Sequence, residues 1–223
     1  MNITIPQLDS GKKPHEAMHV DLLLPYPSGT PFGNLGLAEM ELLCRADYVN
    51  VSLEWLYRTW QTVAHIAGSL PPEVNWIRFR TEDIVYSLRK IFDTLISISF
   101  ILGECKASGA NANKIDIDCI GALLKALDSK GQHPQPWVAC YIAHRPFLEL
   151  LNKVSNAYKH SLANHETLLV HPRQEPAAYY ISNPQNKATP NLQLDGVALS
   201  HLIDLANSAF KSIRQDHRRL LEH

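Results

Sequence analysis

The sequence predicts an all-α protein, an antiparallel helical bundle with an extended N-terminal arm and a small β-hairpin insertion. Over several long segments, apolar residues recur every three or four positions, which is typical of amphipathic helices. Only two short runs, 167–170 and 177–181, are rich in residues that favour strands. Because each amphipathic helix needs a partner for its apolar face, a bundle is the expected arrangement.

The first 36 residues are expected to form the extended arm. Five prolines fall in this segment, and proline fixes φ and lacks an amide donor. The bundle domain should follow over residues 37–220, with the hairpin inserted at about 166–182. The last three residues, 221–223, match the start of a vector-encoded polyhistidine tag, so they are expected to have no part in the function.

Five helical segments are expected in the bundle. They are 37–68 as one long or two consecutive helices, 82–102, a shorter helix ending near residue 127, 145–163 and 197–219. Thr81 is expected to cap the second segment and Gly103 to end it. Asp116 or Asp118 should cap the shorter helix.

Composition and charge are those of an ordinary globular protein. Hydrophobic residues make up 45% of the chain and charged residues 19%. The 21 Lys and Arg against 22 Asp and Glu give a net charge of −1, so no global field draws the protein to nucleic acid or anionic lipid. The longest apolar run is too short to cross a bilayer, and no secretory signal is visible. We expect a cytoplasmic, bacterial protein without a membrane partner.

The sequence lacks the motifs that mark several enzyme classes. The chain has no GxxxxGK[ST], no GxGxxG and no GxSxG, so a nucleotide hydrolase, a Rossmann dehydrogenase and an α/β-hydrolase are all disfavoured. The four cysteines form no CxxC pair. His160, His165, Glu166 and His171 lack the spacing of a metal-binding helix. We therefore predict no metal site and no cofactor.

The 145–163 segment has one face that stands out from the rest of the chain. Its apolar stripe is opposed by four polar side chains, Asn152, Asn156, Lys159 and His160. Asn156 and His160 lie one turn apart, and histidine can change its charge near neutral pH. Asparagine is a poor helix former, so its presence twice favours a binding face; the alternative is a face that simply meets water.

Ser155-Asn-Ala-Tyr-Lys-His160 resembles the Arg-Asn-x-x-x-His motif of the HEPN superfamily, helical-bundle domains found in toxins, RNA-processing nucleases and phage-defence proteins. In that family the arginine and histidine of paired subunits face each other across a dimer cleft and cut RNA without a metal. Asn156 and His160 match the motif, whereas Ser155 stands where the family has arginine. The resemblance implies a homodimer with an RNA or protein partner.

Two functions are compatible with these residues. Because serine cannot supply a fixed cation, the first is a non-catalytic binding or interaction protein of HEPN-like type, linked to RNA, toxin–antitoxin pairs or phage defence. Its ligand would contact Asp93 and the four polar residues of the 145–163 segment. The alternative is a metal-independent endoribonuclease, with His160 as general acid or base and Arg89 as phosphate clamp. Arg89 and Asp93 are also spaced as a simple i,i+4 ion pair.

Overall fold

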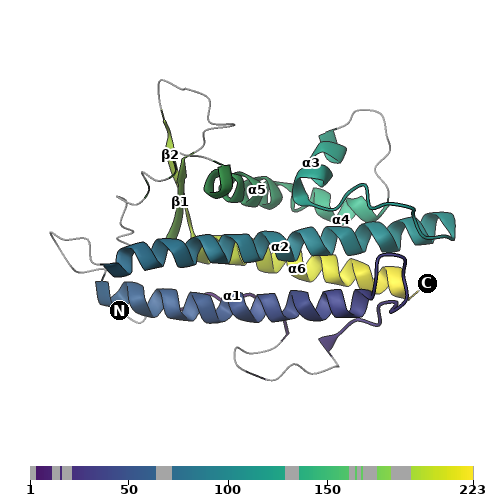
Figure 1. Ribbon diagram of the computed structural model, residues 1–223, viewed down its shortest axis with the longest axis horizontal. Coiled ribbons are helices and arrows are strands. Elements are labelled where there is room, and N and C mark those ends of the chain that lie inside the picture. Colours follow the sequence, from purple (N-terminus) through teal and green to yellow (C-terminus); the bar gives the residue numbers. More distant parts are fainter. Residues whose placement is uncertain are drawn as a thin grey trace.

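The computed structural model describes residues 4–11, 16, 22–63, 72–128, 136–160, 164, 167, 175–181 and 192–222. Over these residues the protein is an all-α bundle with one two-stranded hairpin, as predicted (Figure 1). Its elements are α1 (Leu35–Val63), α2 (Pro72–Ser108), α3 (Ile120–Asp128), the 3₁₀ helix η2 (Pro136–Val138), α4 (Ala139–Ile142), α5 (Arg145–His160), β1 (Ala177–Ile181), β2 (Leu194–Ala198) and α6 (Leu199–Leu221).

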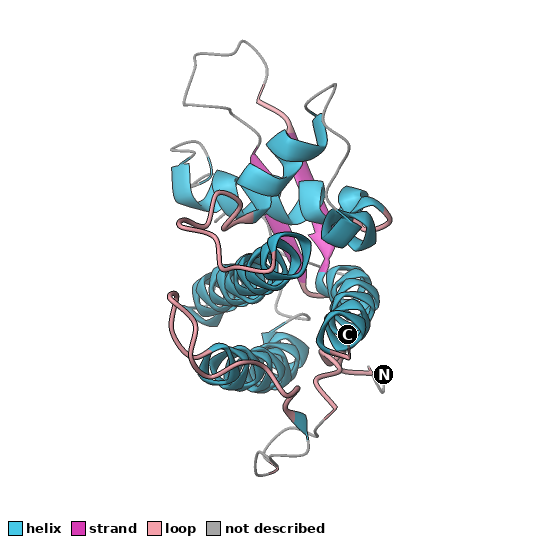
Figure 2. Cartoon of the chain, turned by 90° about the vertical axis from the view of Figure 1, so that its right-hand side faces the viewer, coloured by secondary structure: helices cyan, strands magenta, loops and turns pink. Residues whose placement is uncertain are grey.

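Helix α2 is the centre of the bundle. It packs against α1, α5 and α6, and Figure 2 looks along the long helices from one end. In Figure 1, α1 and α5 run opposite to α2 and α6, while α3, α4 and α5 lie together on one side. The buried stripe of α2 meets α5 through an edge-to-face contact between Phe92 and Phe147, whose ring centroids are 4.9 Å apart. This packing fixes the polar edge of α2 relative to that of α5.

Helix α2 is longer at both ends than the sequence predicts. It begins at Pro72, a residue suited to a first helical turn because it needs no amide partner there. Thr81 is therefore not a cap: it lies inside the helix, and its hydroxyl donates to the Ile77 carbonyl at 2.8 Å. Gly103 does not end the helix either. The Trp137 ring occupies the place of a side chain, and a Cβ on Gly103 would lie 2.1 Å from Trp137 Cδ1.

The hairpin joins different residues from those predicted. The strand at 177–181 is confirmed, but its partner is β2, with Ala177 opposite Ala198 and Tyr179 opposite Gly196. Residues 168–170 lie outside the described residues. Because β2 uses residues up to 198, α6 begins at Leu199 and not at 197. The sequence did not predict β2 because this strand contains Asp195 and Gly196, residue types that are rare in strands. Glycine is nevertheless suited to position 196, since a Cβ there would lie 2.8 Å from the Tyr179 ring.

Residues 4–11, the first described part of the N-terminal arm, contain no helix or strand, and they pack between α1 and α6. The amide of Leu8 donates to Asn50 Oδ1 at 2.6 Å, and the Leu8 carbonyl accepts from Asn50 Nδ2 at 3.0 Å. From α6, Asn207 bonds the Gln7 carbonyl and the Asp9 amide. Leu8 is buried between these two anchors, so the arm is part of the core.

Later in the arm, a buried ion pair connects it to the same two helices. Arg214 of α6 lies 2.5 Å from Glu39 of α1, with the two side chains 13% and 2% exposed. Arg214 also donates to the Leu22 carbonyl, and Glu39 accepts from the Leu24 amide, both at 2.7 Å. The pair therefore holds the arm, α1 and α6 at one point.

Candidate functional site

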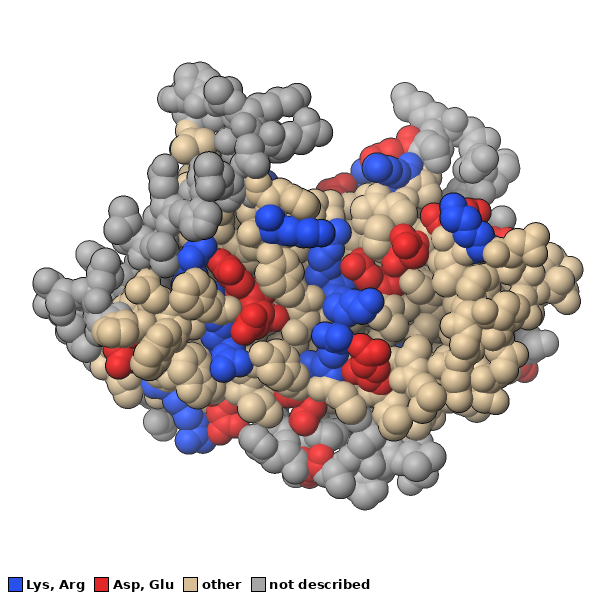
Figure 3. All heavy atoms as spheres, viewed as in Figure 1, with Lys and Arg blue, Asp and Glu red and all other residues tan. Residues whose placement is uncertain are grey.

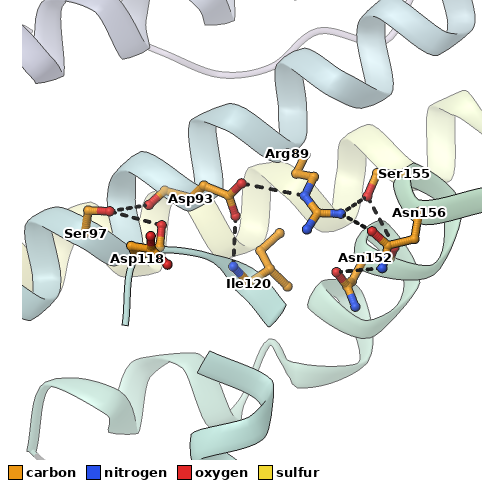
Figure 4. Close-up of polar contacts among 8 residues, drawn as sticks. All are labelled: Arg89, Asp93, Ser97, Asp118, Ile120, Asn152, Ser155 and Asn156. Atoms are coloured by element: carbon orange, nitrogen blue, oxygen red, sulfur yellow. Dashed lines mark hydrogen bonds and ion pairs between the residues drawn. The ribbon is translucent and has the colours of Figure 1, made fainter. Parts of the chain in front are cut away.

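Arg89, halfway along α2, reaches the polar face of α5 (Figure 4). Its Nη1 donates to Ser155 Oγ at 2.6 Å and to Asn156 Oδ1 at 2.7 Å. Asn156 in turn donates from Nδ2 to Asn152 Oδ1 at 3.3 Å. The structure thus joins three of the residues that the sequence proposed for a site, Arg89, Asn152 and Asn156, and adds the buried Ser155 to them.

Asp93 extends this cluster toward α3. One carboxylate oxygen lies 3.6 Å from Arg89 Nε, and the other accepts from the Ile120 amide at 2.8 Å. Asp93 therefore provides the cap of α3 that the sequence assigned to Asp116 or Asp118, because α2 brings its carboxylate to the first amide of that helix. Burial raises the pKa of Asp93, while the Ile120 amide and Arg89 oppose that rise.

Arg89 is held in place yet partly accessible. Its side chain is 21% exposed, and among the described residues its partners are Asp93, Ser155 and Asn156, which leaves Nη2 without an acceptor there. Lys159 and His160 are exposed in the last turn of α5, one turn beyond Asn156. Arg89 therefore presents a fixed hydrogen-bond donor, Nη2, at the border between α2 and α5.

A surface that the sequence reading missed lies next to Arg89. It consists of five large exposed aromatic side chains, which we call the aromatic face: Tyr48 and Trp55 of α1 and Trp76, Phe79 and Tyr86 of α2. Arg80 connects the two helices, donating to Tyr48 Oη at 3.0 Å and lying 5.3 Å from the Trp55 ring centroid. Tyr86 is three residues before Arg89, so the face borders the Arg89 cluster. The sequence did contain a signal for this surface, because these large aromatic residues lie outside the apolar stripes of their helices.

A second polar cluster, also missed, is buried at the other end of the bundle. His217 is 1% exposed, with Nδ1 2.6 Å from Tyr26 Oη and Nε2 2.5 Å from Ser99 Oγ. Ser99 Oγ also lies 2.6 Å from Tyr141 Oη and donates to the Leu95 carbonyl. With Nε2 protonated, each of these groups has a partner and His217 is neutral. Ser99 gives its proton to a backbone carbonyl, so this serine–histidine contact lacks the geometry of an activated nucleophile.

Two negative findings concern the part of the chain that the structure describes. Within it, no three His, Cys, Asp or Glu side chains come together as metal ligands would, while His165, Glu166 and His171 lie outside it. None of its helices has the length and apolar character that crossing a bilayer requires. Comparisons with models of protein families, with curated proteins and with solved structures found no match to this chain.

Proposed function

We propose that the protein is a non-catalytic interaction protein of HEPN-like type that forms a homodimer through its aromatic face. The observation that carries this proposal is the gathering of Trp55, Trp76 and Phe79 on the outside of α1 and α2, at 37%, 51% and 51% exposure. Tryptophan, tyrosine and arginine are the residues that most often dominate the energy of protein interfaces. A group of such residues exposed together indicates an interaction site, whereas single apolar residues scattered over a surface do not.

The charge around the aromatic face favours a protein partner over RNA. Three basic residues of α1 and α2 are paired with acids along each helix, in the ion pairs Glu41–Arg45, Glu54–Arg58 and Arg78–Glu82, while Arg80 lies between Tyr48 and Trp55. Figure 3 shows Lys and Arg interspersed with Asp and Glu on the visible side of the molecule. A protein that binds RNA needs an excess of positive charge on its binding surface. In a two-fold dimer the same surface meets itself, so charges of both signs are needed for the two copies to attract each other.

In this proposal the Arg89 cluster forms one edge of the interface. Arg89 is fixed by Ser155 and Asn156, so little side-chain freedom would be lost when its Nη2 meets a partner's carboxylate. Lys159 and His160 continue the same edge along α5. These residues would set the register of the two copies, while the aromatic face would supply most of the affinity.

Replacing both tryptophans of the aromatic face should separate the dimer. We expect Trp55→Ala with Trp76→Ala to raise the dissociation constant by roughly 30-fold or more per residue, since an interface hot spot contributes about 2 kcal/mol. Multi-angle light scattering across a concentration series measures the change. Ile142→Ala, at an equally exposed apolar residue on α4, is the matched control and should leave the dimer intact. A wild-type chain that remains monomeric contradicts the proposal.

A metal-independent endoribonuclease is the second candidate function, and one contact favours it. Arg89 Nη1 lies 2.6 Å from Ser155 Oγ, so an arginine of α2 lies beside the position where the HEPN motif has its own arginine. Arg89 would stabilise the charge on the scissile phosphate, and His160 would transfer the proton.

The nuclease predicts cleavage of mixed RNA in the presence of a chelator. His160→Ala should then lower the rate about 100-fold or more, the usual effect of losing a general acid or base. His201→Ala, at an exposed histidine of α6, is the matched control and should keep most of the activity. Equal and negligible cleavage by the wild type and both variants would reject the enzyme and leave the interaction protein standing.

A further inference from the structure

A cavity of about 510 Å³ lies between α2, the η2–α4 segment and the last turns of α6. Its volume falls within the range of pockets that bind small molecules. Apolar groups form much of its wall, among them Gly103 and Ala107 of α2, Trp137 of η2 and Leu220 of α6. None of the residues in the Arg89 cluster or the aromatic face lines it, so it is a separate site.

Trp137, one of the residues on the wall of this cavity, is packed closely against α2. Trp137 is 5% exposed, and its indole Nε1 lacks a hydrogen-bond partner among the described residues. Its Cδ1, the ring atom bonded to Nε1, packs on Gly103, which also lines the cavity. The Trp137 ring is therefore held firmly against α2 and adds an aromatic surface to the wall of the cavity.

The charges at the rim favour an anion. Lys106 lies one turn beyond Gly103 on the same face of α2; it is exposed, with no acidic partner among the described residues. Arg219 is already paired with Asp216 at 2.7 Å. His217 adds no charge at neutral pH, because burial lowers its pKa to about 3. The uncompensated charge at the rim is therefore that of Lys106.

We propose that this cavity binds a small amphipathic carboxylate. The carboxylate pairs with Lys106, the uncompensated charge at the rim, which shares a face of α2 with Gly103. The hydrocarbon part of the ligand lies against Ala107 and Leu220. Gly103 has a specific role here, because any side chain at that position would push the Trp137 ring from its place.

The test follows the indole N–H resonance of Trp137 by NMR while octanoate is added below its critical micelle concentration. Trp137→Phe identifies the resonance by its loss. We expect a saturable shift with octanoate, and with 1-octanol as an uncharged ligand of the same length. Ala107→Trp fills the cavity from an exposed position and should abolish both shifts.

A second pair of variants tests the charge. Lys106→Gln should weaken octanoate roughly two- to fivefold, the range expected for a partly exposed ion pair, and leave 1-octanol unchanged. Lys90→Gln, at an exposed lysine of α2 away from the cavity, should change neither. No shift with either ligand, or shifts that persist in Ala107→Trp, would overturn the cavity as a binding site. Unchanged octanoate affinity in Lys106→Gln would overturn the carboxylate.

Discussion

Arg214→Met is expected to lower the free energy of unfolding by about 3–5 kcal/mol, the usual cost of leaving one member of a buried ion pair alone. Without the guanidinium, Glu39 at 2% exposure keeps only the Leu24 amide as a donor, and its pKa rises further because Arg214 is the main group that lowers it. The Leu22 carbonyl loses its donor as well. Urea unfolding followed by circular dichroism measures the loss.

Two further variants separate the ion pair from other effects of the substitution. Arg218→Met, at an exposed arginine one turn along α6, should change the free energy of unfolding by less than about 0.5 kcal/mol. Glu39→Met combined with Arg214→Met should recover most of the lost stability, because apolar side chains of similar size replace both charges. If the Arg214→Met variant were as stable as the wild type, the ion pair would not be what holds the arm.

Acidification is expected to destabilise the protein through His217. Burial lowers the pKa of His217 to about 3 in the folded protein, whereas an unfolded histidine titrates near 6.5. Between these values the unfolded chain binds a proton that the folded chain does not. The contribution of His217 is therefore complete above pH 6.5 and is lost as the pH falls toward 3. Each pH unit costs about 1.4 kcal/mol, or about 5 kcal/mol in total.

The measurement compares urea unfolding at several pH values in the wild type and in His217→Gln. Glutamine can still hydrogen-bond with Tyr26 and Ser99 but does not titrate, so the variant should lose this part of the pH dependence. Carboxylates that titrate in the same range contribute to both proteins, and the difference between them isolates His217. His201→Gln, at an exposed histidine of the same helix, should behave as the wild type does. Parallel profiles for wild type and His217→Gln would refute the assignment.

Helical periodicity was sufficient to predict the bundle, because burial of an apolar stripe is a local property of each segment. Helix α5 shows this best: the expected start at residue 145 is observed, and the described part ends at His160. Local signals failed where a distant residue overrides them. Thr81 and Gly103 carry the signature of helix ends, yet the stripe continues from Val74 to Ile84, and Trp137 replaces the missing side chain of Gly103.

The candidate site was predictable only in part, for the same reason. Asn152 and Asn156 share a face because helix geometry places them one turn apart, and the sequence suggests this directly. Arg89 was proposed beside them, and the structure brings it there from 67 residues away in the chain. The partners of His217 could not be foreseen, since Tyr26 and Ser99 are separated from it by 191 and 118 residues.

The hydrogen bonds that anchor the N-terminal arm to α6 have a consequence for folding during synthesis. Asp9 and Gln7 hydrogen-bond to Asn207, close to 200 residues later in the chain, and Leu8 lies buried between that contact and Asn50 of α1. During synthesis the arm leaves the ribosome close to 200 residues before Asn207, the residue of α6 that binds it. Contacts of such long sequence separation form slowly. Until α6 has been made, the nascent polypeptide therefore lacks the Asn207 half of the binding site for the arm, and chaperones can bind the arm during that interval.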